Sequence, residues 1–173
     1  MISSFIKTKR FFLKPLMLKD VKKHYYNWFN EKEIKRFLKN TIYKNLNDLK
    51  NYTEIEISKK DVVFFGIFTK SNFHIGNIKL YNIKKNHSCE LGLIIGDKKW
   101  RNKHVGKEVI TSCIKEVRKH CGITFFKLGV DSLNFSAYKT YSRIGFRIIK
   151  YRQQNRLKIL DMVYNFYSNQ IRK

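Results

Sequence analysis

The spacing of apolar residues changes along the chain, and each change predicts a different element. Residues 9–17 read as a first strand, in which Pro15 restricts pairing to an edge or to one end of the strand. The stretch that follows has helical periodicity, and its apolar residues fall into three groups: Val21, Tyr25, Trp28 and Phe29 after a capping Asp20; Ile34, Phe37 and Leu38; and Leu46, Leu49 and Tyr52. These three predicted helices contribute to the core or form the wall of a substrate cleft.

Three strands are predicted in the middle of the chain. Residues 62–68 form a continuous apolar run, which is typical of a strand buried on both faces. Residues 75–83 and 89–95 follow after short polar turns, and strands joined in this way favour antiparallel pairing. The pattern therefore predicts an antiparallel meander.

A crossover unit follows the meander. Helical spacing returns at residues 105–120 and stops at Gly122, a residue type that is common just beyond a helix C-terminus. Residues 124–130 are again strand-like. A strand at 89–95, this helix and the next strand form a crossover, which requires its two strands to be parallel.

The C-terminal part adds a short helix and two strands. The helix runs through Tyr141 and stops at Gly145, and residues 146–151 and 159–166 read as strands joined by a polar turn. The sequence contains no linker, internal repeat or low-complexity tract. We therefore expect one α/β (α+β) domain over residues 1–173, with a mixed central sheet of about six to seven strands flanked by helices.

Charge is the strongest compositional bias of the chain. Lys and Arg number 37 against 13 Asp and Glu, which gives a formal net charge of +24. A surplus of this size spreads over much of the surface and attracts anions, whether nucleic acid, an anionic membrane or a phosphorylated small molecule. A coding bias toward Lys and Asn explains it equally well. Apolar residues make up 43% of the chain and aromatic residues 15%, which argues against disorder.

Cysteine usage and the apolar runs bear on location. The three cysteines, Cys89, Cys113 and Cys121, are scattered, which suits a reducing compartment. The N-terminus has no signal-peptide core, and no apolar stretch approaches the roughly 20 residues needed to span a bilayer. We expect a cytoplasmic protein, monomer or homodimer.

The histidines are dispersed: His24, His74, His87, His104 and His120. Their spacing does not suit a metal site, so no metal is expected.

The stretch from Glu90 to Ile110 combines a strand end, a basic loop and the start of a helix. The apolar run stops at Gly96, and Gly106 stands at the mouth of the predicted helix. A helix N-terminus offers unpaired backbone N–H groups and the positive end of the helix dipole, which together suit a phosphate. The alternative is a solvated basic turn.

Two motifs flank the C-terminal half of the crossover unit. The first is the loop Arg101–Gly106, and the second is Asn134, Tyr141 seven residues on, and then Gly145-Phe146. In this order and spacing they resemble the GCN5-related N-acetyltransferase (GNAT) family, although His104 stands where that family prefers glycine. The opening Arg-Phe-Phe-Leu-Lys-Pro-Leu is similar to the branch of ribosomal-protein N-terminal acetyltransferases. The resemblance covers nearly the whole chain.

The resemblance implies acetyl-coenzyme A as co-substrate, and the loop has the chemistry that its phosphates need. Backbone N–H donors are expected from Asn102 to Lys107, with side-chain charge from Arg101, Lys103 and Lys107. By resemblance, the pantetheine arm runs along the strand end and residues of the second motif line the other side. The residues expected to bind the coenzyme are Leu93, Ile94, Ile95, Arg101, Asn102, Lys103, His104, Val105, Gly106, Lys107, Asn134, Tyr138 and Tyr141.

Acetyl transfer to an amine needs a base and a proton donor. An amine with a pKa near ~10 is mostly protonated at neutral pH, and its lone pair is then not free to attack. A carboxylate that acts directly or through one water can take this proton from the amine. Glu90 is the candidate base; otherwise it is a solvent-facing charge and water alone takes the proton. Tyr141 occupies the family's acid position, beside the leaving thiolate; otherwise it is a core tyrosine. No Ser or Cys lies in a nucleophile turn, so we expect direct attack without a covalent intermediate.

The acceptor is expected to be a primary amine, on a nucleotide-linked amino sugar or a protein N-terminus, and the basic surface favours an anionic one. Two other functions fit the sequence. One is a nucleic-acid-binding module that uses the basic surface, although no helix-turn-helix, zinc-finger or aromatic RNA-binding signature is present. The other is a coenzyme-binding protein that has lost transfer activity. His104, in the place of the family's glycine, is the residue that supports this alternative.

Overall fold

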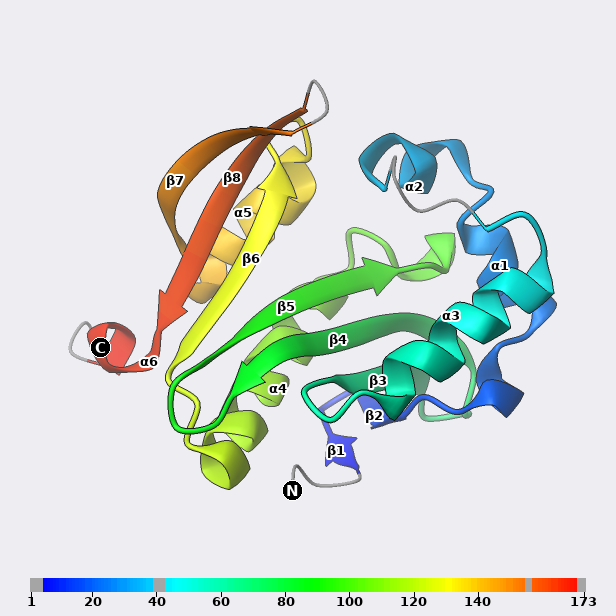
Figure 1. Ribbon diagram of the computed structural model, residues 1–173, viewed down its shortest axis with the longest axis horizontal. Coiled ribbons are helices and arrows are strands. Elements are labelled where there is room, and N and C mark those ends of the chain that lie inside the picture. The colour runs from blue at the N-terminus through cyan, green and yellow to red at the C-terminus, as the bar shows by residue number, and fades with distance from the viewer. Residues whose placement is uncertain (1–4, 39–42, 155–156, 171–173) are drawn as a thin grey trace.

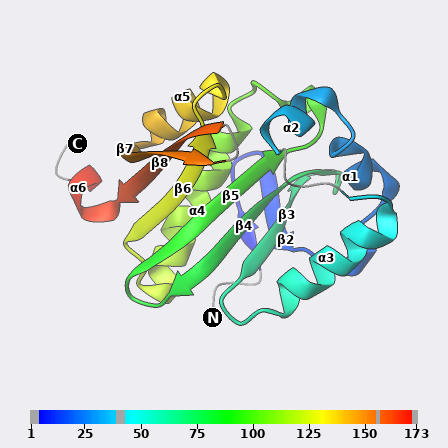
Figure 2. The same cartoon turned by 45° about the horizontal axis from the view of Figure 1, so that its top comes forward.

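The computed structural model of the protein describes residues 5–38, 43–154 and 157–170, which form one mixed β-sheet with helices on both faces (Figures 1 and 2). The strands are β1 (Ile6–Lys7), β2 (Phe11–Pro15), β3 (Val63–Thr69), β4 (His74–Lys84), β5 (Ser88–Ile95), β6 (Phe125–Asp131), β7 (Arg147–Gln154) and β8 (Leu157–Asn165). The helices are α1 (Lys23–Trp28), α2 (Lys32–Phe37), α3 (Leu46–Ser58), α4 (Val105–Cys121), α5 (Phe135–Ile144) and α6 (Phe166–Gln170), with 3₁₀ turns η1 (Leu18–Asp20) and η2 (Lys98–Trp100). The strand order is β1-β2-β3-β4-β5-β6-β8-β7.

The topology confirms both the meander and the crossover unit. β3, β4 and β5 pair antiparallel, and β6 returns parallel to β5 after α4. The described sheet has eight strands rather than six to seven, because β1 was not predicted from the sequence. β1 has two residues, too few to show a period of two. None of the helices described here is long and apolar enough to cross a membrane.

The predicted helix ends are correct at the C-termini and wrong at one N-terminus. Gly122 and Gly145 end α4 and α5 in the left-handed conformation, with φ of 65° and 114°. Asp20 was predicted to cap the first helix, but it lies in η1. Its carboxylate accepts a hydrogen bond from the backbone N–H of Met17, at 3.1 Å, and so faces back along the chain rather than toward α1.

Apolar side chains form two cores, one on each face of the sheet. The main core packs the inner face of the strands against α4 and α5. The second core gathers the aromatic residues of the first helices against Phe64 and Ile94 of the sheet. Its buried members are Leu16, Val21, Tyr25, Trp28, Phe29, Ile34 and Leu49. The sequence allowed the aromatic residues of these helices to lie either in the core or in the wall of a cleft. Most of them lie in the core.

Trp28 of the second core packs directly on Gly96, the residue that follows β5. A Cβ atom built on Gly96 would lie 1.8 Å from Cδ2 of Trp28. The indole is 4% exposed and its ring centroid is 5.0 Å from that of Tyr25, so it has little room to move. This close approach fixes where β5 ends relative to α1.

We expect Gly96→Ala to lower the free energy of unfolding by about 2 kcal/mol, because overpacking forces the indole or the strand end to shift. Gly92→Ala, within β5, is the matched control, since its Cβ would meet only the Tyr81 ring, at 3.9 Å. Denaturant unfolding measures both variants. Equal losses in the two would contradict the contact proposed as the cause.

Candidate active site

β5 and β6 pair along only part of their length. Their register joins Ser88, Cys89 and Glu90 to residues 125–127, and in the described chain the two strands separate beyond that point (Figure 1). One edge of β5 is therefore left without a neighbouring strand. A pocket of about 360 Å³ lies in the opening, between the end of β5, the loop before α4, and helices α2 and α5.

The pocket brings together most of the residues that the sequence singled out. Its walls include Leu93, Ile94, Ile95, Arg101, Asn102, His104, Val105, Gly106, Asn134 and Tyr141. Four predicted residues lie outside its walls: Glu90, Lys103, Lys107 and Tyr138. Tyr138 packs against the main core instead, because it lies on the core-facing side of α5.

Two residues of the loop before α4 have positive φ angles. Asn102 has φ 57° and His104 has φ 59°. His104 is the N-cap of α4, and its side chain makes no capping hydrogen bond. The backbone N–H groups of the first turn therefore remain available to an anion. Gly106 lets this turn approach β5 and α5, since a Cβ there would lie 3.2 Å from Leu93 and 3.4 Å from Thr140.

His104→Gly is expected to raise the free energy of unfolding by roughly 0.5–1 kcal/mol. A side chain in the left-handed region costs about 1–2 kcal/mol, and the greater backbone entropy of glycine offsets part of the gain. His120→Gly, within α4, is the matched control, and its free energy of unfolding should fall by about 1 kcal/mol. Thermal unfolding compares the two, and a destabilised His104→Gly would contradict strain at this position.

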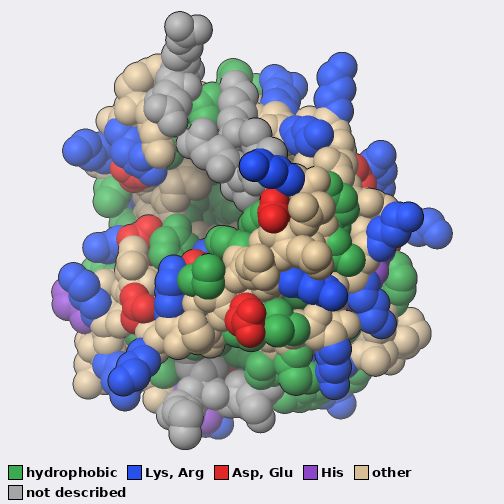
Figure 3. All heavy atoms as spheres, turned by 45° about the vertical axis from the view of Figure 1, so that its right-hand side comes forward, with side chains coloured by type: hydrophobic (Ala, Val, Ile, Leu, Met, Phe, Trp, Pro, Cys, Tyr) green, Lys and Arg blue, Asp and Glu red, His purple; other side chains and the backbone are tan. Residues whose placement is uncertain are grey.

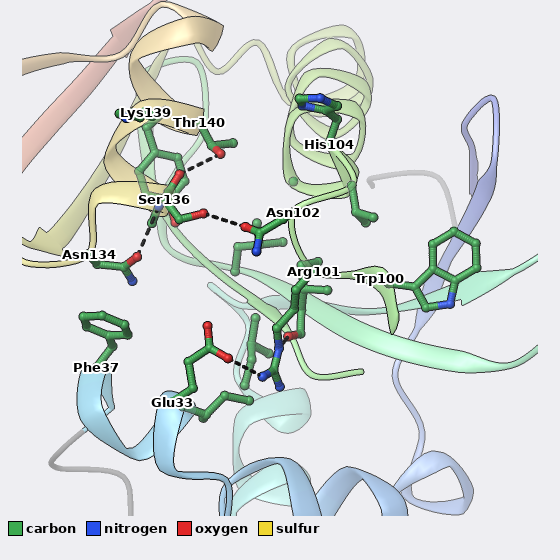
Figure 4. Close-up of a pocket in the computed structure, with 18 of the residues that line it drawn as sticks. Glu33, Phe37, Trp100, Arg101, Asn102, His104, Asn134, Ser136, Lys139 and Thr140 are labelled. Carbon is green, nitrogen blue, oxygen red and sulfur yellow. Dashed lines mark hydrogen bonds and ion pairs between the residues drawn. The ribbon is translucent and has the colours of Figure 1, made fainter. Parts of the chain in front are cut away.

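Arg101 has a different role from the one its charge suggested. Its guanidinium donates 3.0 Å to the carbonyl of Ile95 and 2.5 Å to that of Gly96, and it pairs with Glu31 at 2.8 Å. It also pairs with Glu33 at 2.9 Å (Figure 4). The side chain is 13% exposed. With its donors directed at the strand end and α2, it positions the loop rather than offering free charge to a phosphate.

A second contact holds the same loop from the other side. Arg10 donates to the carbonyl of Lys103 at 2.9 Å and pairs with Glu108 of α4 at 2.7 Å. Hydrogen bonds from Thr8 and Arg10 hold the pKa of Glu108 below its usual value against the opposing effect of burial. Lys103 itself points along the surface, with its ammonium 5.9 Å from the centre of the Trp100 ring.

Helix α5 contributes residues that the sequence reasoning missed. Ser136 donates to the side-chain oxygen of Asn102 at 3.2 Å, joining the loop to α5 (Figure 4). Lys139 and Arg143 also line the pocket and add the positive charge that Arg101 does not supply. Their i, i+4 spacing places them on one helix face and was a usable signal. Asn134 caps α5, because its side-chain oxygen accepts from the N–H of Ala137 at 3.2 Å.

Tyr141 lies where α5 meets both the pocket and the main core. It is 8% exposed, and its ring centroid is 5.9 Å from that of Phe146. Burial, with a smaller effect of Tyr81, raises the pKa of Tyr141 to about 12. The phenol therefore keeps its proton over the physiological pH range and can donate a hydrogen bond.

Glu90 marks the point at which β5 and β6 separate. It lies opposite Tyr81 on β4 and Lys127 on β6, and its carboxylate accepts from the Asn82 side chain at 2.8 Å. Burial first, and then the carboxylate of Glu90, raise the pKa of Tyr81 to about 12. Glu90 does not line the pocket.

The metal-ligating side chains and the thiols of the described residues are dispersed or buried. Among the described residues, no three His, Cys, Asp or Glu side chains converge as metal ligands. Burial raises the pKa of the Cys89 thiol to about 12 and raises the pKa of Cys113 as well. Neither thiol forms a thiolate readily, so neither is suited to act as a nucleophile.

Solved acetyltransferase structures have the same fold at low sequence identity. A spermidine N-acetyltransferase from Vibrio cholerae, in complex with coenzyme A and spermine, matches with a TM-score of 0.79 and 17% identity, over 91% of this chain and 96% of that one. An aminoglycoside acetyltransferase in complex with coenzyme A gives 0.76 and 14%, over 93% and 98%. A structure described as a ribosomal-protein-serine acetyltransferase, also from Vibrio cholerae, gives 0.77 and 15%, over 95% and 99%.

A family model matches most of the chain. No protein with a curated description matches it significantly. The model described as "Acetyltransferase (GNAT) domain" matches residues 10–147, which include the meander, the loop before α4 and the second motif. The chain therefore belongs to the GNAT family of acetyl-coenzyme A-dependent N-acetyltransferases.

Proposed function

We propose that the protein transfers the acetyl group of acetyl-coenzyme A directly to a primary amine on a nucleotide-linked amino sugar or a protein N-terminus. The opening between β5 and β6 carries this proposal. It offers an unpaired strand edge for the amide groups of the pantetheine arm, and the free N–H groups at the start of α4 suit the diphosphate. Lys139 and Arg143 add positive charge on the facing helix.

In the proposed reaction, the amine nitrogen attacks the thioester carbon and the carbon–sulfur bond breaks. Glu90 takes the proton of the incoming ammonium through a water and passes it to solvent. After the attack, the nitrogen loses a second proton to solvent and becomes the amide nitrogen. Tyr141 donates a hydrogen bond to the sulfur as negative charge develops there. Because the pKa of Tyr141 is about 12 and that of a free thiol is about 8.5, full transfer of the phenol proton is uphill. The thiolate therefore takes its final proton from solvent.

The acceptor classes are separated by charge. Spermidine and aminoglycosides, the acceptors named for two of the similar enzymes, are polycations, whereas this chain carries +24. Lys and Arg side chains are spread over the face seen in Figure 3, and the acids beside the pocket, Glu31 and Glu33, are paired with Arg101. This charge disfavours a polycation and supports an acceptor that is neutral or anionic apart from its amine.

A thiol-release assay with acetyl-coenzyme A tests this proposal. The panel contains nucleotide-linked amino sugars, peptides with free N-termini, polyamines and aminoglycosides. We expect release with one of the first two classes and little with the polycations. If the polycations were the best acceptors, the charge argument would be wrong. If no amine in the panel stimulated release, the protein would be a coenzyme-binding relative without transfer activity.

Glu90→Gln is expected to lower kcat/KM for the amine at least roughly tenfold at neutral pH, because the base is lost. The loss should shrink as the pH approaches the amine pKa of about 10, where the amine needs no base. The pH dependence of the rate measures this change of slope. Glu116→Gln, at an exposed pair with His120 on α4, is the control. Parallel profiles for Glu90→Gln and the unmodified protein would exclude Glu90 as the base.

A further inference from the structure

A second hollow opens beside the pocket, between α2 and residues 133–136, which are the end of the β6–α5 connection and the first residues of α5. We call it the α2 groove. The groove and the pocket are continuous, because Glu33, Phe37, Asn134 and Ser136 line both. An elongated molecule can therefore lie in the groove and place one end in the pocket.

The groove exposes apolar side chains that the fold does not use. Leu133 is 54% exposed and Phe135 is 63% exposed, and neither belongs to the two cores. Phe37, on the opposite wall, lines both the groove and the pocket. Exposed apolar side chains grouped beside a pocket are typical of a binding surface rather than of ordinary exterior.

Positive charge surrounds these apolar side chains. Lys32, Lys35 and Arg36 line the groove from α2, and none of the three pairs with an acid in the described part of the chain. The guanidinium of Arg36 lies 5.4 Å from the centre of the Phe37 ring. The one acid in the groove wall, Glu33, is held by Arg101. The groove therefore presents aromatic rings together with three cations that have no acidic partner among the described residues.

We infer that the α2 groove binds the nucleoside diphosphate of a nucleotide-linked amino sugar. A base has a flat face that stacks on an exposed ring such as Phe135, and a diphosphate pairs with unpartnered cations such as Lys35 and Arg36. The sugar amine then extends into the pocket. This assignment rests on the proposed function and selects one of its two acceptor classes, because a peptide N-terminus carries no comparable anion.

Calorimetric titration tests the groove without requiring catalysis. The protein is first saturated with coenzyme A, so that nucleoside diphosphates cannot bind at the coenzyme site. UDP, GDP, CDP and TDP are then titrated separately. At least one is expected to bind. Phe135→Ala and Arg36→Ala are each expected to weaken that binding about tenfold or more, in line with the roughly 1–3 kcal/mol that base stacking contributes.

Two matched variants control for general surface effects. Tyr151→Ala removes a ring that is 59% exposed on β7, and Arg147→Ala removes an exposed cation from the same strand. Neither residue lines the groove, so neither should change the affinity. Affinity for acetyl-coenzyme A should be unchanged in all four variants. Weaker coenzyme binding by Phe135→Ala would assign the groove to the coenzyme and overturn the inference.

The inference also fails if no nucleoside diphosphate binds the coenzyme-saturated protein, or if the two groove variants bind as tightly as the unmodified protein. These failures are distinct from failure of the proposed function. Nucleoside diphosphate binding without thiol release on any amine would support the groove and reject the transferase activity. Thiol release on peptides, with no nucleotide binding, would support the activity and reject the groove.

Discussion

Tyr141→Phe is expected to lower kcat roughly 10²-fold while KM for acetyl-coenzyme A stays nearly constant. The substitution removes one hydroxyl and keeps the ring that packs on Phe146, so the fold and the pocket wall are preserved. A donor that acts on charge developing in the transition state typically contributes 10²–10³ in rate. An interaction made only in the transition state lowers kcat and kcat/KM together.

Tyr138→Phe is the matched control for this substitution. Tyr138 lies on the same helix, but it packs against the main core and does not line the pocket. Loss of its hydroxyl should leave kcat unchanged. Steady-state kinetics with both substrates varied measures both variants. An unchanged kcat in Tyr141→Phe would remove this tyrosine from the mechanism, and equal losses in both would point to a general effect on α5.

Acidification is expected to destabilise the fold by roughly 2–3 kcal/mol by pH 4.5, before most carboxylates titrate. The cause is His74, which is 4% exposed at the start of β4. Its ring lies 4.9 Å from that of Trp28 and 4.8 Å from that of Phe68. Burial lowers the pKa of His74 from 6.5 to about 4, so the imidazole is neutral in the folded protein at neutral pH.

The direction follows from proton binding in the two states. Between pH 6.5 and 4 the unfolded chain binds a proton at His74 that the folded protein does not, so stability falls as the pH falls through this window. His24, 5.6 Å away, adds to the effect because burial and Lys22 lower its pKa against the opposing field of Asp97. The hydrogen bond with Asn77, the charge of Asp20 and the hydrogen bond with the Gly76 carbonyl oppose the shift at His74. The carboxylates of Glu56 and Glu108 have lowered pKa values and contribute only below about pH 4.5.

Denaturant unfolding as a function of pH measures this loss. His74→Phe should flatten the dependence between pH 6.5 and 4.5, and if that variant folds poorly, NMR titration of the His74 ring in the unmodified protein gives the pKa directly. His87→Phe, at an exposed position, should leave the slope unchanged. A stability that is constant over this range would contradict the buried, neutral imidazole.

The sequence was most informative where local chemistry decides the structure. Long periodic segments predicted α4 and the meander, and Gly122 and Gly145 predicted two helix ends, because a left-handed C-cap is a local requirement. β1 was not predicted, because its two residues form a strand only through their pairing with β2. Asp20 was misassigned because the same side chain can accept from N–H groups on either side of it.

The candidate site was predicted only as far as its motifs reach. The loop and the second motif were placed on one pocket, but the partners of Arg101 come from α2, far away in the sequence. Only the two carboxylates are distant in the sequence, and nothing local shows that they would hold this cation in place of a phosphate. The same reason hid the contribution of α2 to the groove, and His104 could be read as strained only once its φ was known.

The central claim is that acetyl-coenzyme A enters between β5 and β6 and places its phosphates at the start of α4. Hydrogen–deuterium exchange with and without acetyl-coenzyme A tests this most directly, because it reports where backbone amides become protected. We expect protection at Leu93–Ile95, at Asn102–Lys107 and around Asn134. The amides of β7, away from the pocket, should be unaffected. Saturating coenzyme that leaves the first two segments unprotected, or protects a different face of the molecule, would contradict the account.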